Sequence, residues 1–454
     1  MWIPKKAEWI IRELMAHGFE AYAVGGCVRD SILGRVPGDW DITTSARPEQ
    51  VKQIFHRTVD TGIEHGTVTV LMDKDAYEVT TYRVDGEYED HRHPKEVTFT
   101  ASLEEDLKRR DFTINAMAYN PETGLVDIFE GMQDLERKVI RCVGDPRERF
   151  DEDALRILRA IRFSAQLGFE IDAATKEAMT EKAETLKDVS AERIRVDLVK
   201  LITSAHPEKI AEACRLGLTR VVLPEYDSIV GVEQHTPNHI YDVEEHTLKA
   251  LKSIGDDQTL RLAMLLHDFG KPLVKKHDDG RDIFYKHPEA SAMIAKEVLK
   301  RLKFDNYTMD RVVRLVKWHG LKYYPNEQSV RRALNRVGRD IFEAFIQVQR
   351  ADISAKNPKV VPGKLALLDE KEQIYRQIIE RGDCFEVKTL AINGRDLIQA
   401  GILPGPLLGA ILDRLVELVI DDQSLNTKDA LIAKALEVKE DPSIFAEKKY
   451  FFEK

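Results

Sequence analysis

A glycine pair behind a short apolar run is the feature that most limits how this chain can fold. The residues Ala21-Tyr22-Ala23-Val24 have the composition of a buried strand, and Gly25-Gly26 follow directly. Glycine adopts φ angles that other residues avoid, so a turn here lets backbone N–H groups approach an anion closely. Apolar residues then recur at helical spacing through Val28, Ile32 and Leu33. The pattern predicts a strand, a phosphate-binding turn and a short helix.

Two aspartates follow in the stretch Gly38-Asp39-Trp40-Asp41-Ile42-Thr43-Thr44. In an extended strand, residues i and i+2 point to the same side, about 7 Å apart. Two such carboxylates can converge on a pair of Mg²⁺ ions, and together with a phosphate cradle they meet the needs of nucleotidyl transfer. For the triplet alone, a surface Asp-x-Asp in a loop is the simpler interpretation. Glu78, on a predicted strand facing the aspartates, is either a third carboxylate or an ordinary edge charge.

The composition is that of a globular protein with several cores. A chain of 454 residues with 43% hydrophobic and 32% charged residues leads us to expect three or four domains. The net charge of −10 argues against a uniformly basic nucleic-acid coat, although a local basic groove remains compatible with it. Four cysteines without C-x-x-C spacing indicate reduced thiols, and the absence of a signal peptide or a spanning apolar run predicts a cytoplasmic protein without membrane contact.

The pattern changes character once along the chain. Strands are predicted at residues 67–71 and 77–82, within a mixed α/β domain that ends near residue 145. From Arg149 onward the apolar spacing is helical and stays so. We therefore divide the chain into an α/β head, a helical neck, a histidine-bearing helical body and a helical tail, over residues 1–145, 146–205, 206–355 and 356–454 respectively.

Two further clusters suit the chemistry of the aspartates. In Arg109-Arg110-Asp111-Phe112-Thr113-Ile114-Asn115, adjacent guanidinium groups could bind a triphosphate or a ribose, although such a run is most often a solvated helix end. Asp153 and Arg156 are predicted to share a helix face as i and i+3, with Arg159 and Arg162 following. A surface salt bridge is the commoner fate of that pair. The pair could instead read cytosine and adenine, which both offer an amino donor beside a ring-nitrogen acceptor.

In their order along the chain, these segments resemble the class II tRNA nucleotidyltransferases, the family of the CCA-adding enzymes and the bacterial poly(A) polymerases. The resemblance rests on five segments, which cover roughly residues 15–205: Ala23–Asp30 with Gly38–Thr44, Asp85–Pro94 as a flexible loop, Glu105–Thr113, Phe150–Arg156, and Ala191–Ile194.

The resemblance implies an α+β nucleotidyltransferase head of the polymerase-beta-like type, followed by an all-α neck, body and tail. It implies that Asp39 and Asp41 bind two Mg²⁺ ions, that Asp153 and Arg156 read the incoming CTP or ATP, and that the loop helps the change from C to A. The expected partners are tRNA, CTP and ATP, without DNA. The residues it assigns to nucleotide binding are Gly25, Gly26, Arg29, Arg109, Arg110, Asp111, Asn115, Asp153, Arg156, Arg159 and Arg162.

A second set of residues lies in the body. Imidazoles interleaved with carboxylates suit a transition metal such as Ni²⁺, Mn²⁺ or Co²⁺. Their order resembles the HD superfamily of metal-dependent phosphohydrolases over about residues 240–355. That resemblance implies one metal held by His246, His267, Asp268 and Asp352, and a second metal or a phosphate held by His287 and His319. The alternative is a scaffold in which these histidines merely pack.

We expect addition of C, C and A to the 3′ end of tRNA, together with HD phosphohydrolase activity on phosphate esters at RNA ends. The nearest rivals are a poly(A) polymerase and an enzyme that adds only CC or only A. A rival of another class is an HD phosphohydrolase whose nucleotidyltransferase half serves only for binding. The tail is expected to hold the tRNA elbow, with Arg331-Arg332 as a basic patch.

Overall fold

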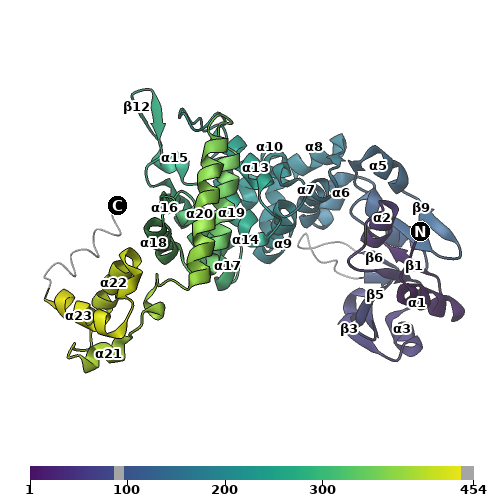
Figure 1. The fold of residues 1–454 in the computed structure, drawn as a ribbon. Helices are drawn as coiled ribbons and strands as arrows, with labels where there is room; N and C mark the ends of the chain where they lie inside the picture. The colour runs from purple at the N-terminus through teal and green to yellow at the C-terminus, as the bar shows by residue number, and fades with distance from the viewer. Residues whose placement is uncertain (86–96, 441–454) are drawn as a thin grey trace. The chain divides into compact units, whose positions relative to one another are not determined.

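The computed structural model describes residues 1–85 and 97–440 (Figure 1). The chain divides into two compact units, and each is described by itself. Unit 1 comprises Met1–Ser228 with Lys300–Phe304, and unit 2 comprises Ile229–Leu299 with Asp305–Lys454. The finer division into head, neck, body and tail stays a prediction. Within the described residues, no helix is both long and apolar enough to cross a membrane.

A seven-stranded mixed sheet organises the first part of unit 1. Strand β1 forms antiparallel pairs with β2 and β8, while β2 and β5 run parallel. The strands, in their order across the sheet, are β3 (Thr58–Gly62), β4 (Thr67–Met72), β5 (Asp75–Thr81), β2 (Ile42–Thr44), β1 (Ala21–Val24), β8 (Met117–Asn120) and β9 (Gly124–Asp127). The strands expected before Gly25 and at residues 67–71 and 77–82 are thus present.

Short helices flank this sheet and set its ends. Helix α1 (Lys5–Ala16) buries Ile10 and Leu14 on one face. It ends before Gly18, which has a φ of +84° that residues with a side chain rarely adopt. Helix α2 (Gly26–Ile32) starts directly after the glycine turn, and α4 (Leu103–Lys108) is capped by Ser102. The other helices of this part are α3 (Pro48–Ile54) and α5 (Gly131–Arg137). A core of Val24, Leu107, Ala116, Ala118 and Val143 joins β1 and β8 to α4.

The rest of unit 1 is almost wholly helical, as the sequence pattern predicts. Helix α7 (Leu155–Leu167) packs against α9 (Ala191–Ile202) along a face rich in leucine and isoleucine. The remaining helices are α6 (Pro146–Glu152), α8 (Ala173–Glu181), α10 (Ile210–Arg215), α11 (Thr219–Val222) and α12 (Pro224–Asp227). Helix α6 ends at Glu152 and α7 begins at Leu155, so the expected helical spacing of Asp153 and Arg156 is wrong.

The described residues of unit 2 are helical apart from one hairpin. Helices α13 (Val243–Ser253), α14 (Gln258–Leu266) and α19 (Phe342–Ser354) pack on one another, and α20 (Val361–Arg381) lies along α19 (Figure 1). The hairpin consists of β12 (Lys276–Asp278) and β13 (Arg281–Ile283). The other helices are α15 (Lys271–Val274), α16 (His287–Arg301), α17 (Asn306–Trp318), α18 (Glu327–Val337), α21 (Gly394–Gln399), α22 (Pro406–Asp421) and α23 (Lys428–Lys439).

Candidate functional site

The glycine turn lies against an arginine. Gly25 precedes α2 with φ +84° and ψ −134°, a conformation that only glycine adopts readily. A Cβ atom at Gly25 would lie 3.3 Å from Nη1 of Arg110, and one at Gly26 would lie 3.6 Å from Nη2 of Arg29. The turn therefore leaves room for two guanidinium groups beside the N-terminus of α2. That combination of backbone N–H groups and cations suits a polyphosphate.

The two aspartates lie in the segment that leads into β2, which begins at Ile42. The carbonyl of Asp41 accepts from the N–H of Val24 at 3.0 Å, so sheet pairing reaches Asp41. Asp41 and Glu78 directly precede the paired residues Ile42 and Val79 of the parallel strands β2 and β5, which places Glu78 beside Asp41. The side chains of Asp39 and Asp41 are exposed, and neither forms a hydrogen bond or ion pair with another residue of the described chain.

The electrostatics of this pair favour a bound cation. Partial desolvation, the Asp39 carboxylate and Glu78 raise the pKa of Asp41 to about 6, against the lowering effect of Arg110. Two neighbouring carboxylates without hydrogen-bond donors offer the oxygen ligands that Mg²⁺ prefers. The donor set thus fits the magnesium ions that the resemblance implies.

One buried carboxylate, Asp106, organises the adjacent arginines. Its Oδ1 accepts from Nε and Nη2 of Arg109 at 3.0 and 2.7 Å, and its Oδ2 accepts from Arg110 at 3.3 Å and from Thr43 Oγ1 at 3.0 Å. Burial would raise the pKa of Asp106, but Arg110 and Arg109 hold it below its usual value. Asp106 is fully buried, while both arginines keep partial exposure. It therefore fixes two cations beside the aspartates.

A second network joins α2 to α7. Arg29 donates to Asn115 Oδ1 at 2.6 Å, Asn115 donates to Asp111 Oδ1 at 3.1 Å, and Arg159 pairs with Asp111 Oδ2 at 2.6 Å. Burial opposes ionisation of Asp111, but Arg159 and Asn115 lower its pKa to about 2. The guanidinium groups of Arg29 and Arg159 also lie 5.0 and 5.4 Å from the ring of Phe163. Four of the predicted nucleotide-binding residues thus belong to one connected group.

Arg162 points to a different partner. Its guanidinium lies 4.3 Å from the Phe163 ring and pairs with Asp197 of α9. Both side chains of that ion pair are buried, which makes it a link between α7 and α9. This contact is structural in character.

Asp153 and Arg156 are held by separate partners. Asp153 Oδ1 caps the N–H of Leu155 at 3.0 Å, and Oδ2 accepts from Arg193 at 2.8 Å. Arg156 pairs with Glu152 and donates to the carbonyls of Arg149 at 3.1 Å and Arg109 at 2.9 Å. The last contact ties α7 to the arginine segment of the first network.

Four residues that position the site were not singled out from the sequence: Asp106, Phe163, Arg193 and Asp197. Asp106 lies in the quoted segment Glu105–Thr113, and its spacing of three and four residues from two arginines on a helix was an available signal. Arg193 lies in the quoted segment Ala191–Ile194. Phe163 and Asp197 act through contacts between helices, which no local pattern shows.

In unit 2 the six predicted HD residues come together. His246 lies in α13, His267 and Asp268 follow α14, His287 starts α16, and Asp352 lies in α19. His319 follows α17. Ligand atoms of His246, His267 and Asp352 lie within 4.8 Å of one another, and so do those of Asp268, His287 and His319. Asp268 also joins the two groups, because its Oδ2 lies 3.1 Å from His267 Nε2 and its Oδ1 lies 3.4 Å from His287 Nε2.

The orientation of these histidines is that of metal ligands. The Nδ1 atoms of His246, His267, His287 and His319 each contact a backbone carbonyl, at 3.2, 2.7, 2.8 and 2.7 Å. A carbonyl can only accept, so each Nδ1 carries the proton and each Nε2 is directed inward. Burial lowers the pKa of His246 and His287, and that of His319 to about 3, which keeps these rings neutral.

Because the protons lie on Nδ1, the Nε2 atoms of neighbouring histidines face each other without a proton between them. Nε2 of His287 lies 3.2 Å from Nε2 of His319, and Nε2 of His246 lies 3.3 Å from that of His267. Facing lone pairs repel unless a cation lies between them. The carboxyl groups of Asp268 and Asp352 have pKa values well below the usual range, because neighbouring histidines and lysines outweigh burial. The donor set therefore fits divalent transition metals.

The expectation that Arg331-Arg332 forms a basic patch is wrong. Arg331 is buried and pairs with Asp383 at 2.6 Å and with Glu327 at 2.6 Å. Arg332 pairs with Glu417 at 3.4 Å and also with Asp421. Both arginines are neutralised by carboxylates from α18, α22 and the segment after α20, so they tie these elements together.

Comparison with known proteins agrees with the site in unit 1. A family model described as "Poly A polymerase head domain" matches residues 21–141, and "Probable RNA and SrmB- binding site of polymerase A" matches residues 168–230. A third model, described as a tRNA nucleotidyltransferase domain 2, matches residues 286–435. Together these models span both units.

Whole-length relatives carry the same name. A CCA-adding enzyme of Levilactobacillus brevis is 36% identical over 93% of this chain and 95% of its own, and one of Streptococcus thermophilus is 35% identical over 94% and 96%. The crystal structure of the Bacillus stearothermophilus CCA-adding enzyme in complex with CTP has a TM-score of 0.72 at 29% identity, covering 96% of this chain and 98% of that one. The fold and site define a nucleotidyltransferase. The chain belongs to the CCA-adding enzyme family, which confirms the resemblance and the expected fold class.

Proposed function

We propose that this chain adds C, C and A to the 3′ end of tRNA, from CTP and ATP, at the site in unit 1. The observation that carries the proposal is the pair of exposed carboxylates, Asp39 and Asp41, which no described residue neutralises by hydrogen bond or ion pair. They lie beside the Gly25 turn and Arg110. The named activity of whole-length relatives agrees with this proposal.

The residues of the site divide the work. Asp39 and Asp41 would hold two Mg²⁺ ions, which supply activation of the 3′-hydroxyl and neutralise the triphosphate and leaving pyrophosphate. Arg109 and Arg110 bind the phosphates, and Asp106 keeps both guanidinium groups turned toward them. The Gly25 turn presents backbone N–H groups to the same phosphates.

Base selection belongs to Asp153 and Arg156. Asp153 accepts from the amino group that cytosine and adenine share, and Arg156 donates to the neighbouring ring nitrogen. Arg193 holds the Asp153 carboxylate at 2.8 Å, and Glu152 holds the Arg156 guanidinium. The two side chains are thus held by different partners but can contact the same base, although they do not share a helix face. Guanine and uracil present the opposite order of donor and acceptor and are rejected.

The predicted division of the chain gives the helical parts their roles. Residues 146–205 form the neck that reads the base, and residues 356–454 form the tail that holds tRNA by its shape and phosphates. Of the predicted flexible loop, residues 86–94 lie outside the described residues. The solved complexes of related enzymes named for tRNA, CTP and ATP are consistent with these partners.

The test uses tRNA that ends at the discriminator base. Purified protein receives CTP, ATP, UTP and GTP, singly and together, and the products are sized. The proposal predicts two C residues with CTP alone, C-C-A with CTP and ATP, and no extension with UTP or GTP. Long A tails would instead identify a poly(A) polymerase, and arrest after CC or addition of A alone would identify a partial enzyme.

We also propose a metal-dependent phosphohydrolase function for the HD residues of unit 2. Two facing pairs of Nε2 atoms at 3.2 and 3.3 Å support it, because neutral imidazoles so placed need cations between them. His246, His267, Asp268 and Asp352 would hold one transition metal, and Asp268, His287 and His319 a second. Such ions supply Lewis-acid activation of water and of a phosphate ester. Lys271 pairs with Asp268 at 2.6 Å and adds a cation for phosphate.

Hydrolysis of a 2′,3′-cyclic phosphate and of a model phosphodiester is measured with Ni²⁺, Mn²⁺ and Co²⁺. Turnover is expected with at least one of them, and its loss is expected in His267→Ala but not in His56→Ala, an exposed histidine of unit 1. Metal binding without turnover would support the metal site and contradict the proposed hydrolase activity. The scaffold interpretation requires that wild-type protein binds no more metal than His267→Ala.

A further inference from the structure

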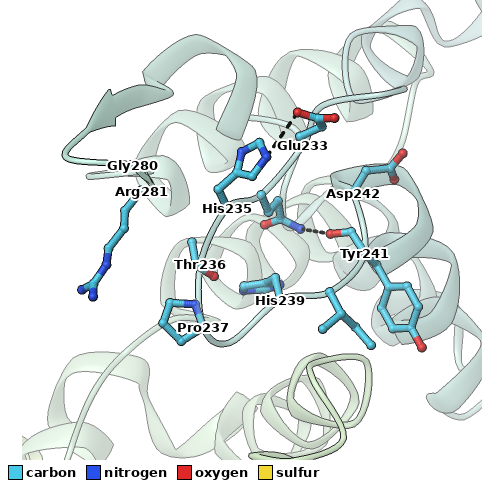
Figure 2. A pocket seen from close by; sticks show the side chains of 11 residues that line it. Glu233, His235, Thr236, Pro237, His239, Tyr241, Asp242, Gly280 and Arg281 are labelled. Atoms are coloured by element: carbon cyan, nitrogen blue, oxygen red, sulfur yellow. Dashed lines mark hydrogen bonds and ion pairs between the residues drawn. The ribbon is translucent and has the colours of Figure 1, made fainter.

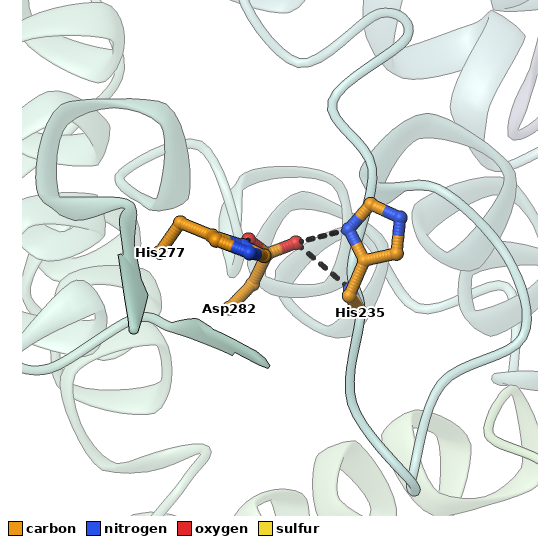
Figure 3. A group of neighbouring side chains, drawn as sticks. All are labelled: His235, His277 and Asp282. Carbon is orange, nitrogen blue, oxygen red and sulfur yellow. Dashed lines mark hydrogen bonds and ion pairs between the residues drawn. The ribbon is translucent and has the colours of Figure 1, made fainter. Parts of the chain in front are cut away.

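A third group of metal-ligating side chains lies at the β12–β13 hairpin, apart from the HD residues. His277 pairs with Asp282 across the two strands, so both side chains lie on the same face of the hairpin (Figure 3). The loop before α13 joins them, because Asp282 N donates to His235 O at 3.1 Å and His235 N donates to Asp282 Oδ2 at 2.8 Å. Two imidazoles from separate segments thus converge on one carboxylate.

His235 lies between two carboxylates. Its Nδ1 is 2.8 Å from Asp282 Oδ2, and its Nε2 is 3.4 Å from Glu233 Oε2. A neutral imidazole carries a single N–H, so it can donate to one carboxylate but not to both. With the proton on Nδ1 the ring donates to Asp282, whereas with the proton on Nε2 toward Glu233 the Nδ1 lone pair faces Asp282 and can bind a cation placed between them. A divalent metal ion can take that place.

His277 provides a second imidazole ligand for such a metal ion. Its Nδ1 lies 2.9 Å from the other oxygen of Asp282, and ligand atoms of His235, His277 and Asp282 all lie within 4.8 Å of one another. A tetrahedral Zn²⁺ with bonds of about 2.0 Å separates its ligands by about 3.3 Å. We propose that His235, His277 and Asp282 form a site for a single divalent transition metal of the Zn²⁺ class, with Glu233 fixing the tautomer of His235.

The surroundings allow such an ion to enter. The side chain of Asp282 is 1% exposed, whereas those of His235 and His277 are 55% and 60% exposed. His235 also lines an open pocket of about 530 Å³ between residues 233–242 and the hairpin turn (Figure 2). Solvent can therefore complete the coordination, as at zinc sites with three protein ligands.

Lys275 is the competing cation. Its Nζ lies 3.2 Å from Asp282 Oδ2 and donates to the carbonyl of Glu233 at 2.6 Å. Asp282 has two oxygens, so the ion and Lys275 can share the carboxylate, or the flexible lysine can turn to solvent. Binding needs no net release of protons from neutral rings, because the proton of each imidazole moves from Nδ1 to Nε2. The site shares no ligand with the HD group and stands independently of either proposed function.

Metal counting tests the site in the full-length protein. Wild type, His277→Ala, His277→Gln and the control His56→Ala are equilibrated with chelator-buffered Zn²⁺ and excess Mg²⁺, and bound zinc is measured by mass spectrometry. Both His277 variants are expected to hold one zinc fewer per chain than wild type and the control. Zinc at the HD residues is the same in all four proteins and cancels in the difference. Equal zinc content in wild type and both His277 variants would overturn the proposal.

Proteolysis gives a second readout that does not depend on counting. Zn²⁺ should slow tryptic cleavage after Lys276 and Arg281 severalfold in wild type, because the ion ties both strands to the loop at His235. It should leave cleavage of His277→Ala unchanged. Protection of that variant equal to that of wild type would contradict a role for His277 as ligand.

Discussion

Asp106, a buried carboxylate, forms an ion pair with the partly exposed Arg109 in which one carboxylate oxygen accepts from Nε and Nη2, at 3.0 and 2.7 Å. The other oxygen of Asp106 holds Arg110. Two cations beside the aspartates would repel each other and move freely without this anchor. Their orientation toward a triphosphate therefore depends on a residue that is itself out of reach of the nucleotide.

Replacement of Asp106 by asparagine should weaken both nucleotides alike. The amide keeps the shape but loses the charge that pairs with two guanidinium groups, so we expect kcat/KM for CTP and for ATP to fall about tenfold or more. Loss of this buried carboxylate charge, which leaves two largely buried guanidinium groups without their partner, should also lower the free energy of unfolding by about 3 kcal/mol. Asp75→Asn, at an exposed pair with Lys6, is the matched control and should change neither quantity. An effect on only one nucleotide would contradict a role in binding phosphate.

Arg193→Ala should reduce the accuracy of addition. It removes the anchor of Asp153 Oδ2 at 2.8 Å and leaves the catalytic carboxylates in place. We expect incorporation of UTP and GTP to rise relative to CTP and ATP by about tenfold, which corresponds to about 1.4 kcal/mol of discrimination. Arg147→Ala, which removes a surface pair with Glu181, serves as control. Unchanged selectivity with lowered rates for every nucleotide would remove Asp153 from base reading.

Alanine substitutions at two glycines with positive φ distinguish the effect of backbone strain from the loss of phosphate binding. Alanine at Gly25 or at Gly34 introduces backbone strain of about 1–3 kcal/mol at φ of +84° and +70° respectively. Only at Gly25 does the new Cβ meet a side chain, at 3.3 Å from Arg110 Nη1, whereas nothing lies within 4 Å at Gly34. Thermal melts should show similar losses, and only Gly25→Ala should lose nucleotide addition. Equal activity of the two variants would contradict a phosphate-binding turn.

The pH dependence of addition should change with the magnesium concentration. Desolvation and Asp39 raise the pKa of Asp41 to about 6, so this ligand becomes protonated as the pH falls through that value. At subsaturating Mg²⁺, the rate of CTP addition should therefore fall with a midpoint near 6. Higher Mg²⁺ competes with the proton and should move the midpoint to lower pH. A pH midpoint that stays the same at every Mg²⁺ concentration would mean that the titrating group is not a metal ligand.

Local pattern sufficed for the elements whose signals lie close together in the chain. The strand before Gly25, the strands β4 and β5 and the change to helices after Arg149 all follow from short-range spacing. Asp153 shows where such reasoning stops. Its side chain accepts a hydrogen bond from the N–H of Leu155, the first residue of α7. Because this local hydrogen bond competes with backbone helix formation, α6 and α7 are separate helices and not the continuous helix that the spacing predicts.

Contacts between distant segments could not be predicted from the sequence. Arg331 and Arg332 look like a basic patch in a linear view, but Asp383 and Asp421 neutralise them through packing of separate helices. The HD residues were identifiable by their order. The position of Asp268 between two groups of histidines depends on how α13, α14, α16, α17 and α19 pack, which the order does not show.

The central claim is that Asp39 and Asp41 serve every addition and select no nucleotide. It is tested most directly by single-turnover incorporation with Asp41→Ala, using CTP on tRNA that lacks CCA and ATP on tRNA that ends in CC. The account predicts that both reactions are abolished in this variant, while CTP still binds. Retained incorporation of either nucleotide at a rate near that of wild type would contradict the account.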